Sequence, residues 1–515
     1  MTQELVLIAG AGPVGMTAAH RIARHGVPVR IVDIAEEPTQ LSKALVVWRR
    51  TFQVLDSTIG FERFLAAGHE ARKVTFFADG KSLGTVALQT ESHQLPAGVF
   101  IPQSKTEKIL NEALADQKIE VQRRTRLVGL MPESDGVTCQ LEGPAGPEQV
   151  RCSWLIGCDG AHSAVRHGLK LAFPGEAVDR RWILGDVRVD AETDPHETMI
   201  ESGPGGSVAL FPVGPDRWRI IADGGPIEAD AVRYDPSIAE LQAVLDDRTG
   251  RGWKISETYW RGEFRVNERQ VENYVHGRVL LAGDAAHVHS PAGGQGMNTG
   301  IQDAANLAWK VALDWHGGSQ PGLVESYQQE RHPVGQFVVK ASGRMLRAAM
   351  ISNPVARHFR DIALHLGLEI PAIRRQLTEF LSEETVNLRG SQLNGSGFRG
   401  ASVQPGDAFP DVAIEQGGKL RPATDLLRGA EAVCLVFGSE VAADLPTRFG
   451  DPQRGFPLTV RHVGPGTETP EVDQLATALG LTQGGVALIR PDSIVAAVGT
   501  APEVVTQLFD HWGVG

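Results

Sequence analysis

The chain has 515 residues, a length typical of about three domains and ample for a large hydrophobic core. Apolar residues make up 42% and charged residues 22%, which excludes a disordered or collagen-like chain. The net charge of -12 argues against nucleic acid and anionic membrane as main partners, and no apolar run approaches the ~20 residues of a membrane helix.

The N-terminal segment predicts a strand, a glycine-rich turn and a helix. An apolar run, residues 5–9, is followed at once by Gly10-x-Gly12-x-x-Gly15, and the next strand ends at Asp33. Glycines in this context permit a tight turn and a close backbone approach to a pyrophosphate, and the helix N-terminus favours an anion. Asp33 can accept a ribose hydroxyl. The motif predicts dinucleotide binding and by itself leaves NAD, NADP and FAD open.

The middle of the chain predicts a mostly antiparallel sheet inserted into the first domain. Strand-like runs separated by glycine, proline and aspartate turns occupy 73–78, 182–189, 207–212, 218–222 and 256–264. We expect a first part of a dinucleotide-binding domain at 1–180, with 73–97 contributing to the substrate sheet. The expected continuation is a substrate domain at 181–276, a second part of the first domain with a helical segment at 277–390, and a small α/β domain at 400–515.

Two further motifs follow strand-like runs. One is Cys158-Asp159-Gly160, and the other begins at Gly283-Asp284 and continues through a glycine-rich loop into a helix over 299–315. A glycine-rich loop lets the backbone lie flat against a planar ring. The helix N-terminus near the loop favours an anion, such as the negative charge of a reduced flavin. The alternative is a glycine-rich connection without a ligand.

Together the three motifs resemble those of the single-component FAD-dependent aromatic hydroxylases, the group A flavoprotein monooxygenases. The resemblance covers residues 1–385 and rests on the order and spacing of all three motifs. It implies an α/β fold with an inserted α+β substrate domain, on a Rossmann-like FAD-binding domain of the p-hydroxybenzoate hydroxylase type. A second Gly-x-Gly-x-x-Gly after a strand, which flavoenzymes with two dinucleotide folds need for NADPH, is absent from the sequence.

The resemblance also implies the residues that hold non-covalent FAD. Gly10, Gly12 and Gly15 would bind the pyrophosphate, Asp33 the adenosine ribose, Lys43 or its neighbouring alternative Arg50 the phosphates, and Asp284 the ribityl chain. Gln103 would lie beside the FAD, Asp159 and Gly160 would serve FAD and the nicotinamide cofactor, and Pro291, Gly294, Gly296, Met297 and Asn298 would form the flavin loop. No catalytic residue is identified, although Pro291 and Gly294 would adjoin the reactive ring, and no metal site is expected.

Four conspicuous polar residues are interpreted as structural. His287 and His289 lie beside the Gly-Asp loop, where a histidine more often packs or hydrogen-bonds than acts as a base. Arg166 and Asp303 are interpreted as supports of their motifs.

The last part of the chain, after a glycine- and serine-rich linker at 389–400, has a resemblance of its own. Residues 486–496 resemble the thioredoxin-like C-terminal domain of the phenol hydroxylase branch and of polyketide-tailoring hydroxylases. The redox pair of true thioredoxins is missing. Cys434 stands alone in the apolar run 432–437, which predicts a buried, inert thiol.

The implied activity is hydroxylation of a phenolic or polycyclic polyketide-like aromatic substrate, with O2 and transient NADPH or NADH, through a flavin C4a-hydroperoxide. Alternatives are a flavin-dependent halogenase, although its Trp-x-Trp-x-Ile-Pro motif is absent, another FAD oxidoreductase on the same scaffold, and a non-catalytic FAD-binding protein. The resemblance leaves a homodimer open. Four cysteines in so long a chain and an N-terminus without a basic leader favour the cytoplasm.

Overall fold

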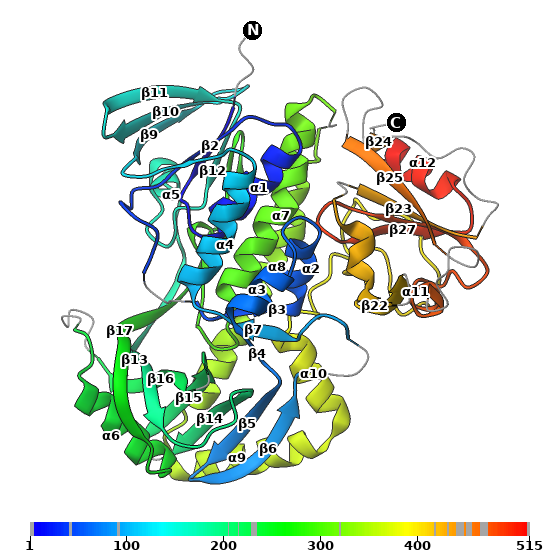
Figure 1. The fold of residues 1–515 in the computed structure, drawn as a ribbon. Coiled ribbons are helices and arrows are strands. Elements are labelled where there is room, and N and C mark those ends of the chain that lie inside the picture. The colour runs from blue at the N-terminus through cyan, green and yellow to red at the C-terminus, as the bar shows by residue number, and fades with distance from the viewer. Residues whose placement is uncertain are drawn as a thin grey trace.

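The computed structural model describes residues 5–511 apart from 41–43, 90–92, 204, 215, 228–233, 319–320, 417–418, 430–431, 439–447, 450–455 and 464–471, so Lys43 lies outside the described residues. Figure 1 shows a helix-flanked parallel sheet, a twisted sheet below it and a C-terminal sheet to its right. Within the described ranges, no helix is both long and apolar enough to cross a membrane.

The first sheet has the order β18-β19-β12-β1-β2-β8 and is parallel except for the β18–β19 pair. Its central strands are buried on both faces, which explains their uninterrupted apolar sequences. Helices α1 and α7 pack against each other beside it. The bounds are β1 Val6–Ala9, β2 Val29–Val32, β8 Val121–Gln122, β12 Trp154–Gly157, β18 Val275–His276, β19 Val279–Leu281, α1 Pro13–Arg24 and α7 Gly296–Trp315.

The second sheet has the order β20-β17-β13-β16-β15-β14-β5-β6 and is antiparallel except for the β14–β5 pair, as expected for the middle of the chain. Alternation along its strands produces two faces. One face packs on α6 through Leu241 and Leu245, and the opposite face packs on α8 through Leu346. The bounds are β5 Lys73–Ala78, β6 Lys81–Ala87, β13 Gly175–Asp190, β14 Glu197–Gly203, β15 Gly206–Pro212, β16 Arg217–Pro226, β17 Lys254–Gln270, β20 His287–Val288, α6 Ile238–Thr249 and α8 Ser326–Ala349.

Two more helices, α9 Pro354–Glu369 and α10 Pro371–Leu381, complete the helical segment expected within 277–390. Pro333 lies inside α8 without ending it. Asn353 caps α9, since its Oδ1 accepts from the backbone N–H groups of Val355 and Ala356 at 3.0 and 3.1 Å. Pro354 occupies the first helical position, where its missing N–H costs nothing.

The C-terminal sheet has the order β24-β25-β23-β26-β27 and is mixed, because β23 is parallel to β25 and antiparallel to β26. Cys434 lies on the central strand with no exposed surface, and burial raises the pKa of its thiol to about 12, as the expected inert cysteine requires. The bounds are β23 Ala432–Phe437, β24 Arg448–Phe449, β25 Phe456–Val463, β26 Gly485–Ile489, β27 Val495–Gly499, α11 Val472–Leu479 and α12 Glu503–His511.

Smaller elements connect these layers. They are the β9–β11 sheet (Arg126–Pro132, Val137–Gly143, Gly146–Cys152), the sheet of β3 Val46–Trp48, β7 Gly98–Phe100 and β4 His69–Glu70, the pair β21 Ala413–Gln416 and β22 Lys419–Pro422, helices α2 Arg49–Asp56, α3 Glu62–Ala67, α4 Gln103–Asp116 and α5 Ala164–Gly168, and the short turns η1 Gly283–Ala285 and η2 Ala423–Leu427.

Candidate active site

The glycine-rich loop between β1 and α1 is shaped by close contacts at two of its three glycines. A Cβ atom on Gly10 would overlap the carbonyl oxygen of Cys158, and one on Gly15 would overlap the carbonyl oxygen of Gly10. A Cβ atom on Gly12 would meet no atom of the described residues within 4 Å, so Gly12 borders open space among them. No described side chain caps the first turn of α1. Its N–H groups are therefore available to an anion placed against Gly12.

Asp33, at the end of β2, is held against this loop. Its Oδ2 accepts from the backbone N–H of Ala11 at 2.6 Å, and its Oδ1 accepts from that of Ala35 at 2.7 Å. Arg123 lies 3.7 Å from the same carboxylate. The aspartate thus fixes the glycine loop, and its side chain remains partly exposed beside it.

The second motif follows β12 and touches the first, because the N–H of Cys158 donates to the carbonyl of Ala9 at 2.8 Å. Asp159 Oδ2 accepts from the N–H of Val165 at 3.1 Å, while its Oδ1 is buried and has no hydrogen-bond partner among the residues that the structure describes. Burial raises the pKa of this carboxyl. A buried acceptor without a partner is costly, and a ligand hydroxyl would satisfy it. Gly160 follows on the partly exposed side of the turn.

Arg166 joins the second motif to the third. Its Nη1 donates to the carbonyl of Ala285 at 3.0 Å and its Nη2 to that of Ala161 at 2.7 Å. The guanidinium also lies 4.0 Å from the ring centre of Phe173. These contacts fit the structural role expected for Arg166.

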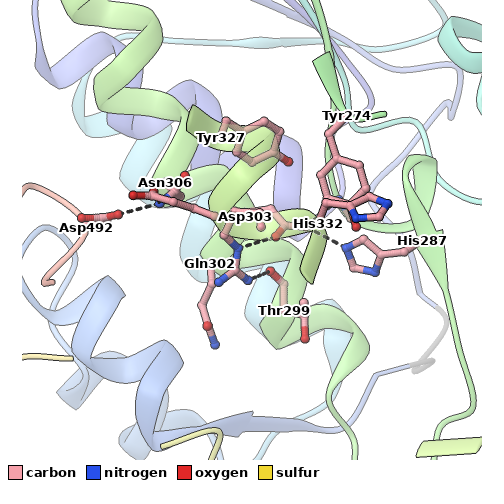
Figure 2. Close-up of polar contacts among 12 residues, drawn as sticks. Tyr274, His287, Thr299, Gln302, Asp303, Asn306, Tyr327, His332 and Asp492 are labelled. Carbon is pink, nitrogen blue, oxygen red and sulfur yellow. Dashed lines mark hydrogen bonds and ion pairs between the residues drawn. The ribbon is translucent and has the colours of Figure 1, made fainter. Parts of the chain in front are cut away.

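Asp303 on α7 organises the Gly-Asp turn η1. It is fully buried and accepts from the N–H of Gly283 at 3.2 Å, from His287 Nε2 at 2.8 Å and from Arg331 Nε at 2.7 Å. Burial acts to raise the pKa of the Asp303 carboxyl, but Arg331 and His287 outweigh it and the net pKa is lowered. Figure 2 shows His287 pointing at Asp303 from the neighbouring strand. His287 and Asp303 therefore support the turn.

Three elements meet beside Asp284. A Cβ atom on Gly283 would lie 2.9 Å from Val14 Cγ2, and one on Gly300 would lie 2.6 Å from Val14 Cγ2 and 3.1 Å from the Cα of Gly283. The start of α1, the turn η1 and the first turns of α7 are consequently in van der Waals contact. Asp284, next along the chain, keeps an exposed side chain on this surface.

The glycine-rich loop before α7 is tied to β3. Asn298 Oδ1 accepts from the N–H of Trp48 at 2.9 Å, and its Nδ2 donates to the carbonyls of Val46 and Gly294, each at 2.9 Å. Trp48 Nε1 donates to the carbonyl of Gly293 at 2.9 Å. Gly294 has φ of +66°, and a Cβ atom there would lie 2.5 Å from Val46 Cγ1. A side chain at this position would strain the backbone and would require the Val46 side chain to shift, so glycine suits it.

The N-terminus of α7 opens onto this loop. Within the described part of the chain no side chain caps this helix end. Gly296 and Met297 are partly exposed, the rest of the loop is largely so, and Pro291 is more exposed. His289 lies behind the loop, and burial followed by the proximity of His287 lowers its pKa to about 4. His289 is therefore neutral at pH 7 and adds no charge to the site.

The remaining expected residues lie at the edges of the site. Gln103 Oε1 accepts from the N–H of Ala44 at 3.1 Å, and its Nε2 donates to Glu107 at 2.9 Å, so it fixes the chain that follows Lys43. Arg50 donates instead toward the C-terminal sheet, to the carbonyls of Asp492 at 3.1 Å and Ser493 at 3.4 Å. Figure 2 places Asp492 beside Asn306 on α7.

Two important neighbours were not predicted from the sequence. Trp48 holds the loop, and Glu383 accepts from Thr299 Oγ1 at 3.2 Å and from Gln302 Nε2 at 2.5 Å in the first turns of α7. Burial raises the pKa of Glu383 to about 8. Both residues are far from α7 in the chain and belong to no motif, so no local signal could have identified them.

The chain is similar to known proteins both in sequence and in fold. The family described as "FAD binding domain" matches residues 3–342. A 6-methylpretetramide 4-monooxygenase of Streptomyces rimosus is 34% identical, over 96% of this chain and 90% of its own, and a rifampicin monooxygenase of Streptomyces venezuelae is 32% identical, over 81% and 88%. The solved structure of OxyS anhydrotetracycline hydroxylase from Streptomyces rimosus superposes with a TM-score of 0.77 at 29% identity, covering 99% of both chains. The expected fold is confirmed.

Proposed function

The chain belongs to the FAD-binding monooxygenases of the aromatic and polyketide hydroxylase branch, and on that basis we propose that its substrate is a polycyclic aromatic polyketide. Its activity is that of an FAD-dependent monooxygenase that hydroxylates aromatic or polyketide substrates. Relatives that match the whole chain are named for fused-ring substrates, and this supports the polycyclic class.

The observation that carries the cofactor assignment is the meeting of two uncapped helix N-termini. Those of α1 and α7 converge at the contact of Val14, Gly283 and Gly300. The open space at Gly12 and the unpartnered Oδ1 of Asp159 fit a ligand that carries both an anion and hydroxyl groups. FAD has both.

In this proposal, Gly12 and the first turn of α1 hold the pyrophosphate, Asp33 and Asp159 accept from ribose hydroxyls, and Asp284 accepts from the ribityl chain. The N-terminus of α7 favours negative charge on the ring edge that it faces. When bound, FAD supplies the redox chemistry that activates O2. Asn298 and Trp48 keep the loop backbone in place, so the binding surface is preorganised.

The substrate is proposed to lie between the glycine-rich loop before α7 and the face of the second sheet that is opposite α6. Phe211 and Arg219 are direct cross-strand neighbours on that face, and Phe211 makes an edge contact with Phe100, with ring centres 5.6 Å apart. Phe100 pairs with Val46, which borders Gly294. This path of apolar residues joins the sheet to the loop. An apolar wall with a few polar groups suits a flat aromatic ligand.

The proposal is tested by oxidation of NADPH, with NADH in parallel, in the presence of naphthols, anthraquinones and anthrones, and of phenol as the monocyclic comparison. We expect slow oxidation without substrate, acceleration by the fused-ring compounds, and a product one oxygen heavier when 18O2 is supplied. Acceleration by phenol alone would contradict the proposed substrate class, and oxygen derived from water would contradict the monooxygenase reaction on these substrates. The four cysteines, all free thiols, support the further proposal of a cytoplasmic location.

A further inference from the structure

Glu383 is a buried acid that lies against α7, the helix whose N-terminus faces the glycine-rich loop. The residue is 1% exposed. Its Oε1 accepts from Thr299 Oγ1 at 3.2 Å, and its Oε2 accepts from Gln302 Nε2 at 2.5 Å. Thr299 and Gln302 belong to the first two turns of α7. The carboxyl group is therefore fixed beside the part of α7 that is nearest the loop.

The turn that carries Glu383 is held on both sides. The carbonyl of Phe380 accepts from Nε2 of Gln295, the residue that precedes α7, at 2.8 Å. The carbonyl of Ser382 accepts from the backbone N–H of Arg50 at 3.2 Å. Glu383 follows the C-terminus of α10 with φ of +62°, a conformation in which glycine is the usual residue. Glutamate has a conformational cost at this position, which points to a function for its side chain.

Two arginines attract the Glu383 carboxylate without pairing with it. They are Arg331 of α8 and Arg50 of α2. Arg331 pairs with Asp303 at 2.7 Å, Arg50 donates to the carbonyl of Asp492, and neither forms an ion pair with Glu383 in the described part of the chain. Burial outweighs their attraction and raises the pKa of Glu383 to about 8. The carboxyl can therefore gain or lose a proton at mildly alkaline pH.

A small cavity adjoins this group of side chains. Its wall is polar on the side nearest Glu383, where it is formed by Arg50, Gln302 and Arg331. The volume of about 10 Å³ is enough for one water molecule, and the wall offers that molecule several hydrogen-bonding groups. A water in this cavity would give the buried carboxyl a neighbour with which to exchange its proton.

A charge on Glu383 and a charge at the loop act on each other across the start of α7. The helix rises 1.5 Å per residue, so Thr299 and Gln302 lie about 5 and 9 Å along its axis from Gly296. Inside a protein, two like charges ~10 Å apart shift each other's pKa by about one unit. Negative charge on a ligand at the N-terminus of α7 would therefore raise the pKa of Glu383 further.

We propose that Glu383 takes up a proton from solvent when the FAD at the loop is reduced, and releases it when the FAD is oxidised again. This rests on the proposed position of the flavin ring at the N-terminus of α7. Hydride from NADPH or NADH brings two electrons and one proton to FAD and leaves one negative charge there. A second proton, from water, neutralises Glu383. Glu383 is thus a positioning residue that acts through α7, whose N-terminus then stabilises the reduced ring unopposed.

The first test is the midpoint potential of the bound FAD between pH 6.5 and 9.5, measured spectroscopically against reference dyes. Glu383→Gln mimics the protonated acid, so the two proteins should have equal potentials near pH 6.5. Above pH 9 the ionised Glu383 of the wild type opposes reduction. Its reduction equilibrium should be about tenfold less favourable than that of the variant, which is ~30 mV for a two-electron couple. A difference that does not change with pH would overturn the proposal.

Glu384→Gln is the matched control for the potential. Glu384 is the next residue along the chain, and its pKa of about 2 keeps it ionised throughout this pH range. Its substitution should shift the potential by the same amount at every pH. A shift that grows with pH, as in Glu383→Gln, would show that the effect does not belong to Glu383.

The second test counts protons with an indicator dye while the FAD is photoreduced in weakly buffered solution. At pH 8.5 the uptake should be about half a proton larger in the wild type than in Glu383→Gln. Thr299→Val keeps the carboxyl and serves if Glu383→Gln loses FAD. It removes a donor to the carboxylate, so the pH of maximal extra uptake should rise. Equal uptake in the wild type and Glu383→Gln, or an unchanged profile in Thr299→Val, would overturn the proposal.

Both tests are independent of the proposed substrate class, because neither uses a hydroxylation substrate or a nicotinamide cofactor. If fused-ring compounds fail to accelerate NADPH oxidation, the proposed substrate class falls and the pH dependence at Glu383 is still expected. If the potential difference is constant with pH while those compounds are hydroxylated, only the role of Glu383 falls. A wild type that binds no FAD would contradict both.

Discussion

Helices α7 and α9 depart in opposite ways from the usual pattern of apolar residues inside and polar residues outside. The buried helix α7 carries Thr299, Gln302, Asp303, Asn306 and Lys310 at helical spacing, each with little or no exposed surface. The surface helix α9 instead exposes an apolar stripe, formed by Val355, Phe359, Ile362 and Leu366. A buried polar residue and an exposed apolar one are each informative, because neither follows from the general tendency of apolar residues to lie inside. The comparison shows that α7 is held by specific partners within the chain.

The partners of α7 come from distant parts of the sequence. Glu330 on α8 accepts from Lys310 Nζ at 2.6 Å and from Arg490 at 2.7 and 2.9 Å, and Asp492 accepts from Asn306 Nδ2 at 2.8 Å. Burial acts to raise the pKa of Glu330, but Arg490 and Lys310 outweigh it and hold the pKa well below its usual value. These bonds join the turn after β26 to α7, the helix whose N-terminus faces the glycine-rich loop.

The largest effect is expected from breaking this network. Arg490→Met leaves the buried carboxylates of Glu330 and Asp492 without their main counter-charge, and we expect a loss of about 3–5 kcal/mol in the free energy of unfolding. Urea denaturation measures it. Arg421→Met removes a half-exposed pair with Asp425 and should cost less than about 1 kcal/mol. Equal losses in the two variants would show that the network does not hold α7.

The next effect concerns Glu383, whose pKa is raised to about 8 against 4.5 in a solvated state. The folded state then binds a proton that the unfolded state releases, so the wild type should lose stability as the pH rises from 4.5 to 8. Glu383→Gln should remove this loss, on the order of 2–4 kcal/mol. Denaturation across this pH range measures the difference between the variant and the wild type.

The neighbouring Glu384 provides the matched control for that experiment. Burial opposes its ionisation, but His93 and Arg49 hold its pKa at about 2. Its contribution is present above pH 4.5 and is lost as the pH falls toward 2, so Glu384→Gln should alter only the acid side. Parallel pH profiles for the two variants would contradict the environments assigned to them.

A smaller effect is expected at the loop that α7 faces. Asp284→Ala should weaken FAD retention by about 1.5–3 kcal/mol, because a hydrogen bond from a ligand hydroxyl to a charged group is lost. Equilibrium dialysis of released FAD measures the affinity, and the melting temperature of the FAD-free protein should be unchanged. Unaltered affinity would remove Asp284 from the proposed site.

The smallest effect is expected on α9. Phe359→Ser should change the free energy of unfolding by less than about 0.5 kcal/mol, because the ring is 66% exposed and contributes little to the packing of its own chain. Urea denaturation measures it. A loss comparable with that of Arg490→Met would mean that the stripe packs within its own chain.

Local patterns predicted the elements well. The runs 73–78, 182–189 and 207–212 were expected as strands and lie in β5, β13 and β15. The expected helix after the third motif is α7, which begins three residues earlier, at Gly296. Burial on one or both faces dictates which residues such strands contain, and this requirement is visible in a few consecutive residues. Roles of the individual site residues remain predictions.

The sequence by itself determined the order of the strands and helices, the three glycine-containing turns and the family, because each depends on neighbouring residues. Only the tertiary structure decided that Arg50 contacts the turn near Asp492, that Glu383 lies against α7, and that the stripe on α9 is exposed. These features depend on which distant segments meet. A side chain's partners and charge state are set by the surroundings that folding creates, and no local pattern specifies them.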